Sequence, residues 1–321
     1  MPYQYILITV LSCFFLAVSS RLLINALSRI AKYLGWKEFV VAFFMMAFAS
    51  SLPNLFVGII AALNKIPELS LGDVIGGNIA DTSLIIGLSA LVSRMGLSAQ
   101  SRTVQGSSIF TILIAVLPLF LVSDGALTRG DGVILLLSFF VYSFWLFKKR
   151  ERFEKIYDGI NEKMTLSFFL KNFFVFLVAS LILVASAYGL VKSSGFFASF
   201  LGLPVTLIGI LIVGIGNSLP ELFFSLQAAR KGQDWLILGN IMGGVVILST
   251  LVLGTVVLIS PIQVSKSSTL SSILIGRIFL IISSLFFLIF IRTNRKITRK
   301  EAVILISIYF VFVLFELLNQ I

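Results

Sequence analysis

The sequence consists of long apolar runs separated by short polar segments. A helix needs about 20 apolar residues to cross the hydrocarbon core of a bilayer, and most of these runs approach or exceed that length. Because backbone amides find no water inside a bilayer, each run predicts a helix rather than a strand. Ten membrane spans are predicted, at residues 3–22, 38–63, 71–93, 104–123, 131–147, 166–191, 202–229, 235–260, 270–291 and 301–319.

Composition places the chain among all-α integral membrane proteins. Of its 321 residues, 58% are hydrophobic and 12% are charged, whereas a soluble domain is typically about 25% charged. The single cysteine excludes an intrachain disulfide, and the lack of histidine excludes a Cys/His metal site. No nucleophile–base pairing and no nucleotide-binding loop is recognisable, so we expect neither an enzyme nor a bound cofactor.

The 25 Lys and Arg side chains are distributed unevenly over the predicted loops. With ten spans, 19 of these 25 fall on one side of the membrane and four on the other. Cytoplasmic loops collect basic residues, so the crowded side is predicted to be cytoplasmic and both termini extracytoplasmic, in the plasma membrane. The net charge of +11 therefore reports orientation and not nucleic-acid binding. The expected partners are the lipid bilayer and inorganic cations.

The chain contains an internal repeat in which one fixed offset aligns its first half with its second. The segment Ser51–Phe56 (SLPNLF) matches Ser218–Phe223 (SLPELF), and with the same offset the pair Gly76–Gly77 falls on Gly243–Gly244 without a gap. Five spans separate equivalent positions, so the second copy crosses the membrane in the reverse direction. Inverted repeats with interrupted helices form a transporter architecture in which the substrate binds near the bilayer midplane.

The longest hydrophilic stretch separates the two copies. Its mixed charge predicts a solvated cytoplasmic linker at residues 148–165. Residues 1–147 are then the first five-helix repeat, and residues 166–321 are the second, inverted one.

Each copy places a proline in the middle of an apolar span, Pro53 in the second span and Pro220 in the seventh. Proline removes a helical hydrogen bond and clashes with the preceding turn, so helices 2 and 7 are predicted to be broken. Carbonyl groups freed near Ala47 and Gly214 become candidate ligands. Such groups persist in a bilayer only where they face protein, a cavity or an ion.

Two acidic residues lie deep inside predicted spans, Asp81 in the first half and Glu221 in the second. Ionisable groups at that depth are costly and mark ion pathways. The side chains around them carry oxygen, and without sulfur or imidazole they favour hard cations such as Ca²⁺, Na⁺ or Mg²⁺. The other candidate ligands are Ser50, Ser51, Asn54 and Asn78 from the first half, with Asn217 and Ser218 from the second.

Two further features receive a structural interpretation. The glycine pairs are expected to let the third and eighth helices approach the broken ones closely. Asp73 is expected to lie at the start of its helix, where a negative charge favours the positive helix end.

These residues resemble the motifs of the calcium/cation antiporter superfamily, which includes the prokaryotic sodium/calcium exchangers. Members have ten helices in two inverted repeats, each with a broken helix marked G-T-S-x-P-E and a following helix marked G-N-x-I-G-S-N. The counterparts here are Ala49–Asn54 and Gly72–Asn78 in the first half, with Gly216–Glu221 and Gly239–Val245 in the second. The resemblance implies a secondary-active cation antiporter, most readily a Na⁺/Ca²⁺ exchanger that works by alternating access as helices 1 and 6 slide across a fixed core.

The resemblance also shows where this chain departs from its family. Each motif glutamate binds the central cation, and an Asn or Asp 27 positions later completes the site. Here those positions hold Asn54 and Asp81 in the first half, and Glu221 and Leu248 in the second. Serines that supply hydroxyls in the family are replaced by Gly77 and Gly244, which we keep as candidate metal-binding positions.

Two carboxylates neutralise one Ca²⁺, two Na⁺ or two H⁺, so we expect weaker Ca²⁺ binding, or an altered counter-ion stoichiometry, relative to typical members. Proton coupling is an alternative, because a buried carboxyl binds a proton more readily than one in water. The same residues are also compatible with a monovalent-cation antiporter of this fold, and with a cation-binding membrane protein that does not transport.

Overall fold

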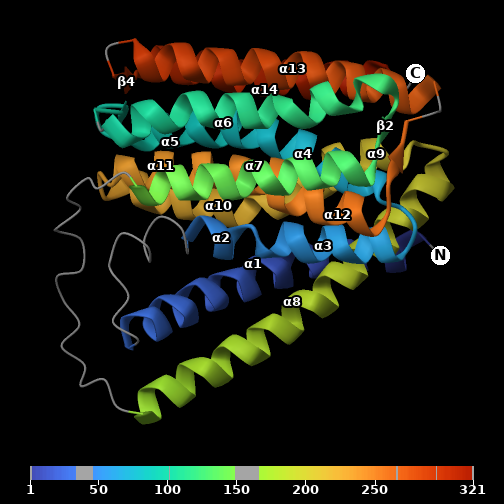
Figure 1. The fold of residues 1–321 in the computed structure, drawn as a ribbon, viewed down its shortest axis with the longest axis horizontal. Helices are drawn as coiled ribbons and strands as arrows, with labels where there is room; N and C mark the ends of the chain where they lie inside the picture. The colour runs from blue at the N-terminus through green and yellow to red at the C-terminus, as the bar shows by residue number, and fades with distance from the viewer. Residues whose placement is uncertain are drawn as a thin grey trace.

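The computed structural model describes residues 2–33, 46–100, 102–148, 166–264, 267–293 and 295–319. Most of these residues lie in helices stacked side by side (Figure 1). The α-helices are α1 (Pro2–Tyr33), α2 (Met46–Ser50), α3 (Leu52–Leu63), α4 (Glu68–Ile79), α5 (Ile86–Val92), α6 (Arg102–Leu121), α7 (Arg129–Lys148), α8 (Leu166–Leu201), α9 (Val205–Ile208), α10 (Gly214–Arg230), α11 (Asp234–Ile247), α12 (Leu253–Ile259), α13 (Ser267–Arg292) and α14 (Arg299–Leu318). Between them lie the π-helical segments η2 (Ala80–Ile85), η4 (Gly209–Val213) and η5 (Leu248–Val252), and the 3-10 turn η3 (Val122–Asp124).

The described residues contain nine helical stretches long and apolar enough to cross a membrane. The remaining predicted span, at 38–63, consists of α2 and α3 in its described part, and residues 38–45 lie outside the described residues. Both ends of the chain lie at the same end of the helix stack, as an even number of spans requires (Figure 1). The prediction of an all-α membrane protein with ten spans is confirmed.

Two short antiparallel ladders display the inverted repeat. The strands are β1 (Leu97–Ser98), β2 (Ala126–Leu127), β3 (Ile262–Gln263) and β4 (Lys296–Ile297). The first strand pairs with the fourth and the second with the third, and the two ladders lie at opposite ends of the helices (Figure 1). The offset that aligns Ser51 with Ser218 carries β1 close to β3 and β2 close to β4. One half is therefore turned over relative to the other.

Matched π-helical segments in the third and eighth spans show the same relationship. The third span runs α4–η2–α5 and the eighth runs α11–η5–α12, so both are continuous helices with a wide turn near the middle. Asp81 lies in the first of these wide turns and Leu248 opens the second. π-Helical turns are rare and are frequent at functional sites.

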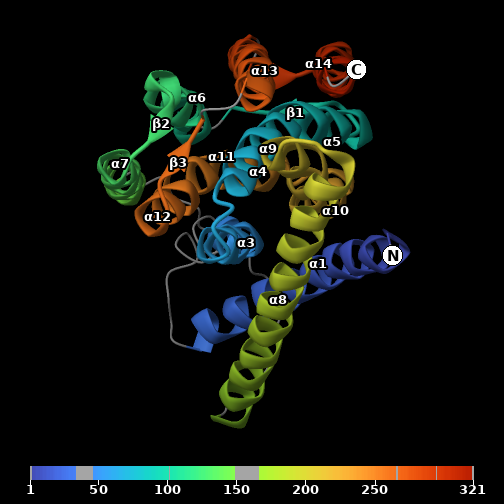
Figure 2. The same cartoon turned by 90° about the vertical axis from the view of Figure 1, so that its right-hand side faces the viewer.

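Helices α1 and α8 lie outside the rest of the stack (Figure 2). They pack against each other, with the Thr9 hydroxyl donating to the Ser193 hydroxyl at 2.8 Å. Only 28% of the apolar window of α1 and 33% of that of α8 is buried, against 83% in the third and eighth spans. The arrangement of the helices marks the first and sixth spans as an outer pair; burial does not, because α7 and α14 are as little buried, at 33% and 28%.

The core is built on close backbone contact between the two halves. A Cβ atom on Gly76 of α4 would overlap the carbonyl oxygen of Ile210 in η4, and one on Gly243 of α11 would lie 2.7 Å from the Cβ of Ala47 in α2. The third span thus packs against the seventh and the eighth against the second, because glycine lets helices approach this closely.

Substituting Gly76 by Ala is expected to destabilise the protein by about 3 kcal/mol or more, because backbone atoms of both halves must move to admit the methyl group. Thermal unfolding in detergent measures the effect. Gly195→Ala is the matched control, since its new Cβ would lie 3.7 Å from the Ile66 side chain, an ordinary contact. Equal melting temperatures for the two variants would show that the α4–η4 contact is not tight.

The two predicted helix breaks turn out differently. The second span is interrupted at Ser51, between α2 and α3, with Pro53 in the first turn of the new helix. In the seventh span Pro220 lies inside the continuous helix α10, so the prediction of a break at that proline is wrong. A proline can kink a helix without ending it when neighbouring groups compensate for the lost hydrogen bond. The irregular backbone of this span is η4, which precedes α10.

The expected linker at residues 148–165 lies outside the described residues except for Lys148, the last residue of α7. The next described helix, α8, begins at Leu166. Helix α7 is thus the fifth span, and α8 is the sixth.

Candidate cation site

A pair of equivalent hydrogen bonds joins the two halves at the centre of the stack. The Asn217 amide nitrogen on α10 donates to the Asp73 carboxylate on α4 at 3.1 Å, and the Ser50 hydroxyl on α2 donates to the Asn240 amide oxygen on α11 at 3.4 Å. The offset of the internal repeat relates Ser50 to Asn217 and Asp73 to Asn240. Each bond therefore connects the helix carrying one proline motif with the glycine-rich helix of the other half.

Asp81 lies beside these bonds and faces the second half. The Ser218 hydroxyl lies beside its carboxylate, and only 3% of its surface is exposed. A Cβ atom on Gly244 would lie 3.8 Å from one Asp81 oxygen, and one on Gly77 would lie 3.7 Å from the Ser218 oxygen. The two motif glycines thus leave room around the Asp81–Ser218 contact.

Glu221 of α10 points to the same region from the opposite half. It is 3% exposed, and the Ser50 hydroxyl lies beside its carboxylate. It is close enough to Asp81 and Asp73 to interact with both electrostatically. The acids predicted from the two halves therefore share one buried region. We call the region lined by Ser50, Asp81, Asn217, Ser218, Glu221, Gly77 and Gly244 the central site.

Several buried oxygens in and around the central site have no hydrogen-bond donor. Buried acceptors are nearly always satisfied, so a group of them calls for an explanation such as a bound ion. Carboxylate and amide oxygens are the ligands of hard cations. The unsatisfied acceptors are one oxygen each of Asn54, Asp73, Asn78, Asp81, Asn217 and Glu221.

Acidic side chains alone do not supply a complete set of ligands for one ion. Among the residues that the structure describes, no three acidic, cysteine or histidine side chains converge on a single metal position. Leu248 is buried, and its side chain lies 3.2 Å from where a Cβ of Gly77 would be, so an apolar group fills that corner. Amide, hydroxyl and backbone oxygens have to supply the remaining ligands.

The Ala47 carbonyl, expected to be free, is occupied. It accepts the Ser51 backbone N–H at 3.1 Å and the hydroxyls of Ser50 and Ser51 at 3.1 and 2.8 Å. The Ser51 N–H is the ordinary helical donor to this carbonyl, and serine hydroxyls commonly bond back to a carbonyl three or four residues earlier, so Pro53 does not free this group. The expectation of a freed carbonyl is therefore wrong at Ala47, and its role as a cation ligand stays a prediction.

The other candidates lie near the centre in different roles. Gly214 begins α10 with its backbone against Gly77, whose nitrogen would be 2.9 Å from a Cβ on Gly214. The Asn78 amide donates to the Ser249 hydroxyl at 2.7 Å and leaves its own oxygen without a donor. Asn54 is buried on α3, with its oxygen likewise unsatisfied.

The expectation that Asp73 caps its helix is wrong. Helix α4 begins at Glu68, so Asp73 lies in its second turn, fully buried and facing Asn217. The start of an apolar helix is hard to locate from sequence, which makes a capping position plausible. The repeat carries the missing signal, since Asp73 is equivalent to Asn240 and both stand where the family motif has Asn.

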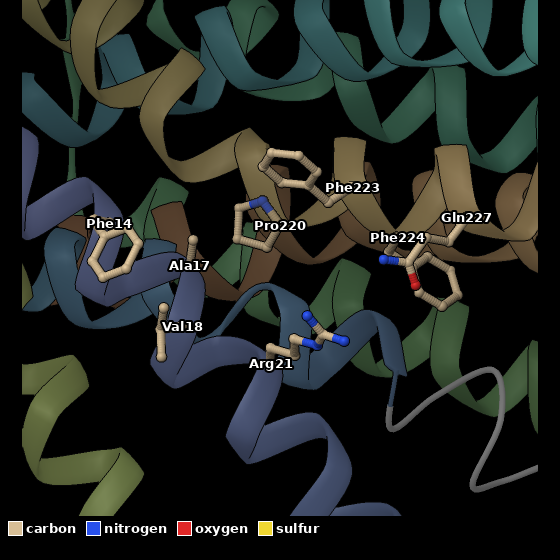
Figure 3. Close-up of a pocket in the computed structure, with 8 residues that line it drawn as sticks. All are labelled: Phe14, Ala17, Val18, Arg21, Pro220, Phe223, Phe224 and Gln227. Atoms are coloured by element: carbon tan, nitrogen blue, oxygen red, sulfur yellow. The ribbon is translucent and has the colours of Figure 1, made fainter.

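A cavity of about 370 Å³ lies between α1 and α10 (Figure 3). Its walls are mostly apolar, with Arg21 and Gln227 as its polar side chains. Pro220 borders this cavity while its neighbour Glu221 is buried in the central site. The cavity therefore lies beside the contact between α1 and the helix that carries the second-half acid. The lining residues are Phe14, Ala17, Val18, Arg21, Pro220, Phe223, Phe224 and Gln227.

The inverted repeat and its buried, oxygen-rich centre define a membrane protein of the ion-transporter class. The family model described as sodium/calcium exchanger protein matches residues 4–148 and 171–318. The chain therefore belongs to the sodium/calcium exchanger family of cation antiporters.

Individual relatives agree with this assignment. The sodium/calcium exchanger MaX1 of Methanosarcina acetivorans is 29% identical over 345 residues, which cover 95% of this chain and 96% of the relative. The inner membrane protein YrbG of Escherichia coli is 26% identical over 245 residues, or 74% of this chain and 75% of that protein. A structure of the sodium-calcium exchanger NCX_Mj soaked with Na⁺ and Sr²⁺ matches with a TM-score of 0.66 at 24% identity, covering 98% of both chains. This likeness supports the same fold.

Proposed function

We propose that this protein is a secondary-active antiporter that exchanges Na⁺ for Ca²⁺ at the central site. The observation that carries the proposal is the group of buried carboxylate and amide oxygens without donors, to which both halves contribute. Those ligands suit hard cations. Family membership and the exchanger name of MaX1 support the choice of Na⁺ and Ca²⁺.

Transport by reconstituted protein tests the proposal. Vesicles loaded with Na⁺ and diluted into Na⁺-free buffer with ⁴⁵Ca²⁺ are expected to accumulate Ca²⁺, and vesicles with equal Na⁺ on both sides are not. Accumulation driven by a pH gradient without Na⁺ would overturn the choice of Na⁺ as coupling ion. Binding of Ca²⁺ with no flux under any gradient would overturn transport itself.

Movement of α1 and α8 across the core is the proposed route to alternating access. Three observations support it: the pair lies outside the rest of the stack, its two helices are joined to each other by the Thr9–Ser193 bond, and a cavity opens between α1 and α10 beside their contact. The close glycine contacts within the core favour its movement as one rigid body.

We further propose that residues 1–147 and 166–321 are the two repeats, and that the basic loops and the linker at 148–165 face the cytoplasm. The distribution of Lys and Arg supports this orientation. In a Cys13→Ser background, a cysteine at exposed Thr128 is expected to react with an impermeant thiol reagent in intact cells. A cysteine at exposed Lys231 is expected to react only after the membrane is opened. The reverse pattern would contradict the orientation.

Replacing Asn54 by Glu is expected to tighten Ca²⁺ binding by about tenfold, because it adds a carboxylate at the position equivalent to Glu221. Equilibrium binding of ⁴⁵Ca²⁺ in detergent measures the change. Asn54→Gln is the control, since it adds the same length without the charge and is expected to leave affinity unchanged or weaker. Equal affinities for the Glu and Gln variants would show that Asn54 does not face the ion.

A further inference from the structure

Asp73 is a buried acid of the central region that neither the sequence motifs nor the proposed ligand set assigns. It is fully buried in α4. One carboxylate oxygen accepts the Asn217 amide at 3.1 Å, and the other has no donor. A buried carboxylate left half satisfied is costly. Asp73 lies on the glycine-rich helix at the interface of the two halves, and a costly group at this place points to a role in the site.

The contact determines which way the Asn217 amide faces. A carboxylate only accepts hydrogen bonds, so the NH₂ group of Asn217 has to point to Asp73. The amide oxygen is then turned away from Asp73, and it is buried without a donor. Asp73 therefore presents the Asn217 oxygen as a free ligand.

The equivalent hydrogen bond in the other half does not fix the orientation of its amide group. There the Asn240 amide oxygen accepts from the Ser50 hydroxyl, and the Asn240 nitrogen has no partner. A neutral amide can face a hydroxyl with either its oxygen or its nitrogen. The orienting charge is thus present on one side of the pseudo-two-fold arrangement only.

Asp73 also changes the charge near the central site. It interacts electrostatically with Glu221 and Asp81. A nearby negative charge stabilises a bound divalent ion twice as strongly as a monovalent ion at the same place. A third acid, Asp73, therefore offsets the negative charge that this chain lacks at Asn54 and Leu248, where the family motif has acidic or amide ligands.

We propose that Asp73 is a positioning and selectivity residue of the cation site: it holds the Asn217 oxygen free for the ion and adds a negative charge that favours Ca²⁺ over Na⁺. This inference rests on the proposed function. It does not require Asp73 to touch the ion.

Binding of ⁴⁵Ca²⁺ and ²²Na⁺ to wild type and Asp73→Asn tests the inference. We expect Ca²⁺ affinity to fall by about tenfold and Na⁺ affinity by about threefold, the square root of that factor, because the lost charge acts on ions of charge two and one. Asp73→Asn/Asn240→Asp returns a carboxylate at the equivalent position. It is expected to recover most of the Ca²⁺ preference, a rescue that a merely structural role would not give.

The controls separate the possible failures. Glu316→Gln removes a buried acid on α14 and is expected to leave both affinities unchanged. Melting temperatures without cations show whether each variant folds. Wild type that binds no Ca²⁺ would overturn the proposed function. This inference alone would be overturned if wild type binds Ca²⁺ and a folded Asp73→Asn variant keeps the same Ca²⁺/Na⁺ preference. It would also be overturned if Asn240→Asp does not relieve the defect of Asp73→Asn.

Discussion

Glu221→Gln and Asp81→Asn are each expected to reduce Na⁺-driven Ca²⁺ uptake by about 100-fold or more. Both substitutions keep the shape of the side chain and remove its negative charge. Each of the two residues is only 3% exposed. Removing one partner from a buried charge interaction costs about 3–5 kcal/mol, and every 1.4 kcal/mol is a factor of ten in affinity. Uptake of ⁴⁵Ca²⁺ into proteoliposomes and equilibrium Ca²⁺ binding measure the loss.

The double variant adds a test of whether the two acids serve one ion. If they do, losing the second costs less than losing the first, so the effects on binding do not add. Glu316→Gln, which changes another buried acid outside the central site, is expected to retain uptake. Uptake at wild-type rates by Glu221→Gln, or strictly additive losses, would contradict a shared site.

Gly216→Cys is expected to give a transporter that stops on oxidation and recovers on reduction. A Cβ atom on Gly216 of α10 would lie 3.9 Å from the Cβ of Cys13 on α1, within the range of about 3.5–4.5 Å that disulfides need. Cys13 is the single native cysteine, so the product is defined. The bond would link the outer helix α1 to the helix that carries Glu221. Transport is expected to fall to background because α1 can no longer move across the core.

Mass spectrometry of the oxidised protein establishes how completely the bond forms, and uptake after treatment with a reductant gives the baseline. Cys13→Ser/Gly216→Cys is the matched control, since it carries the same change on α10 and has no partner thiol. Its uptake is expected to be insensitive to oxidant. Full cross-linking with unchanged uptake would show that α1 and α10 keep their relative positions during transport.

Much of this fold could be predicted from the sequence because a bilayer leaves few choices. Apolar length sets the spans, and the fixed offset between Ser51 and Ser218 sets the inversion that the exchanged β1–β4 and β2–β3 ladders display. The same offset places Asp81 and Glu221 in opposite halves, which is what allows them to share a region. These inferences depend on periodicity and repetition, which survive without knowledge of side-chain contacts.

The details that failed depend on local competition for hydrogen bonds. Pro220 lies inside α10 without ending it, because the cost of a proline depends on which groups lie nearby. The Ala47 carbonyl is taken by serine hydroxyls that the sequence offers equally as ion ligands. The predicted span at 71–93 places Asp73 near a helix start, whereas α4 begins at Glu68, more than one turn earlier. In each case the sequence names the donors and acceptors but not their pairing.

The central claim is that acids from two inverted halves hold one hard cation between them. The most direct measurement is a crystal structure of the protein grown with Sr²⁺, in which anomalous scattering locates the ion. We expect a peak between the carboxylates of Asp81 and Glu221, beside Ser218 and Gly244, that disappears in Glu221→Gln. A peak elsewhere in the protein, or no peak at saturating Sr²⁺, would contradict it.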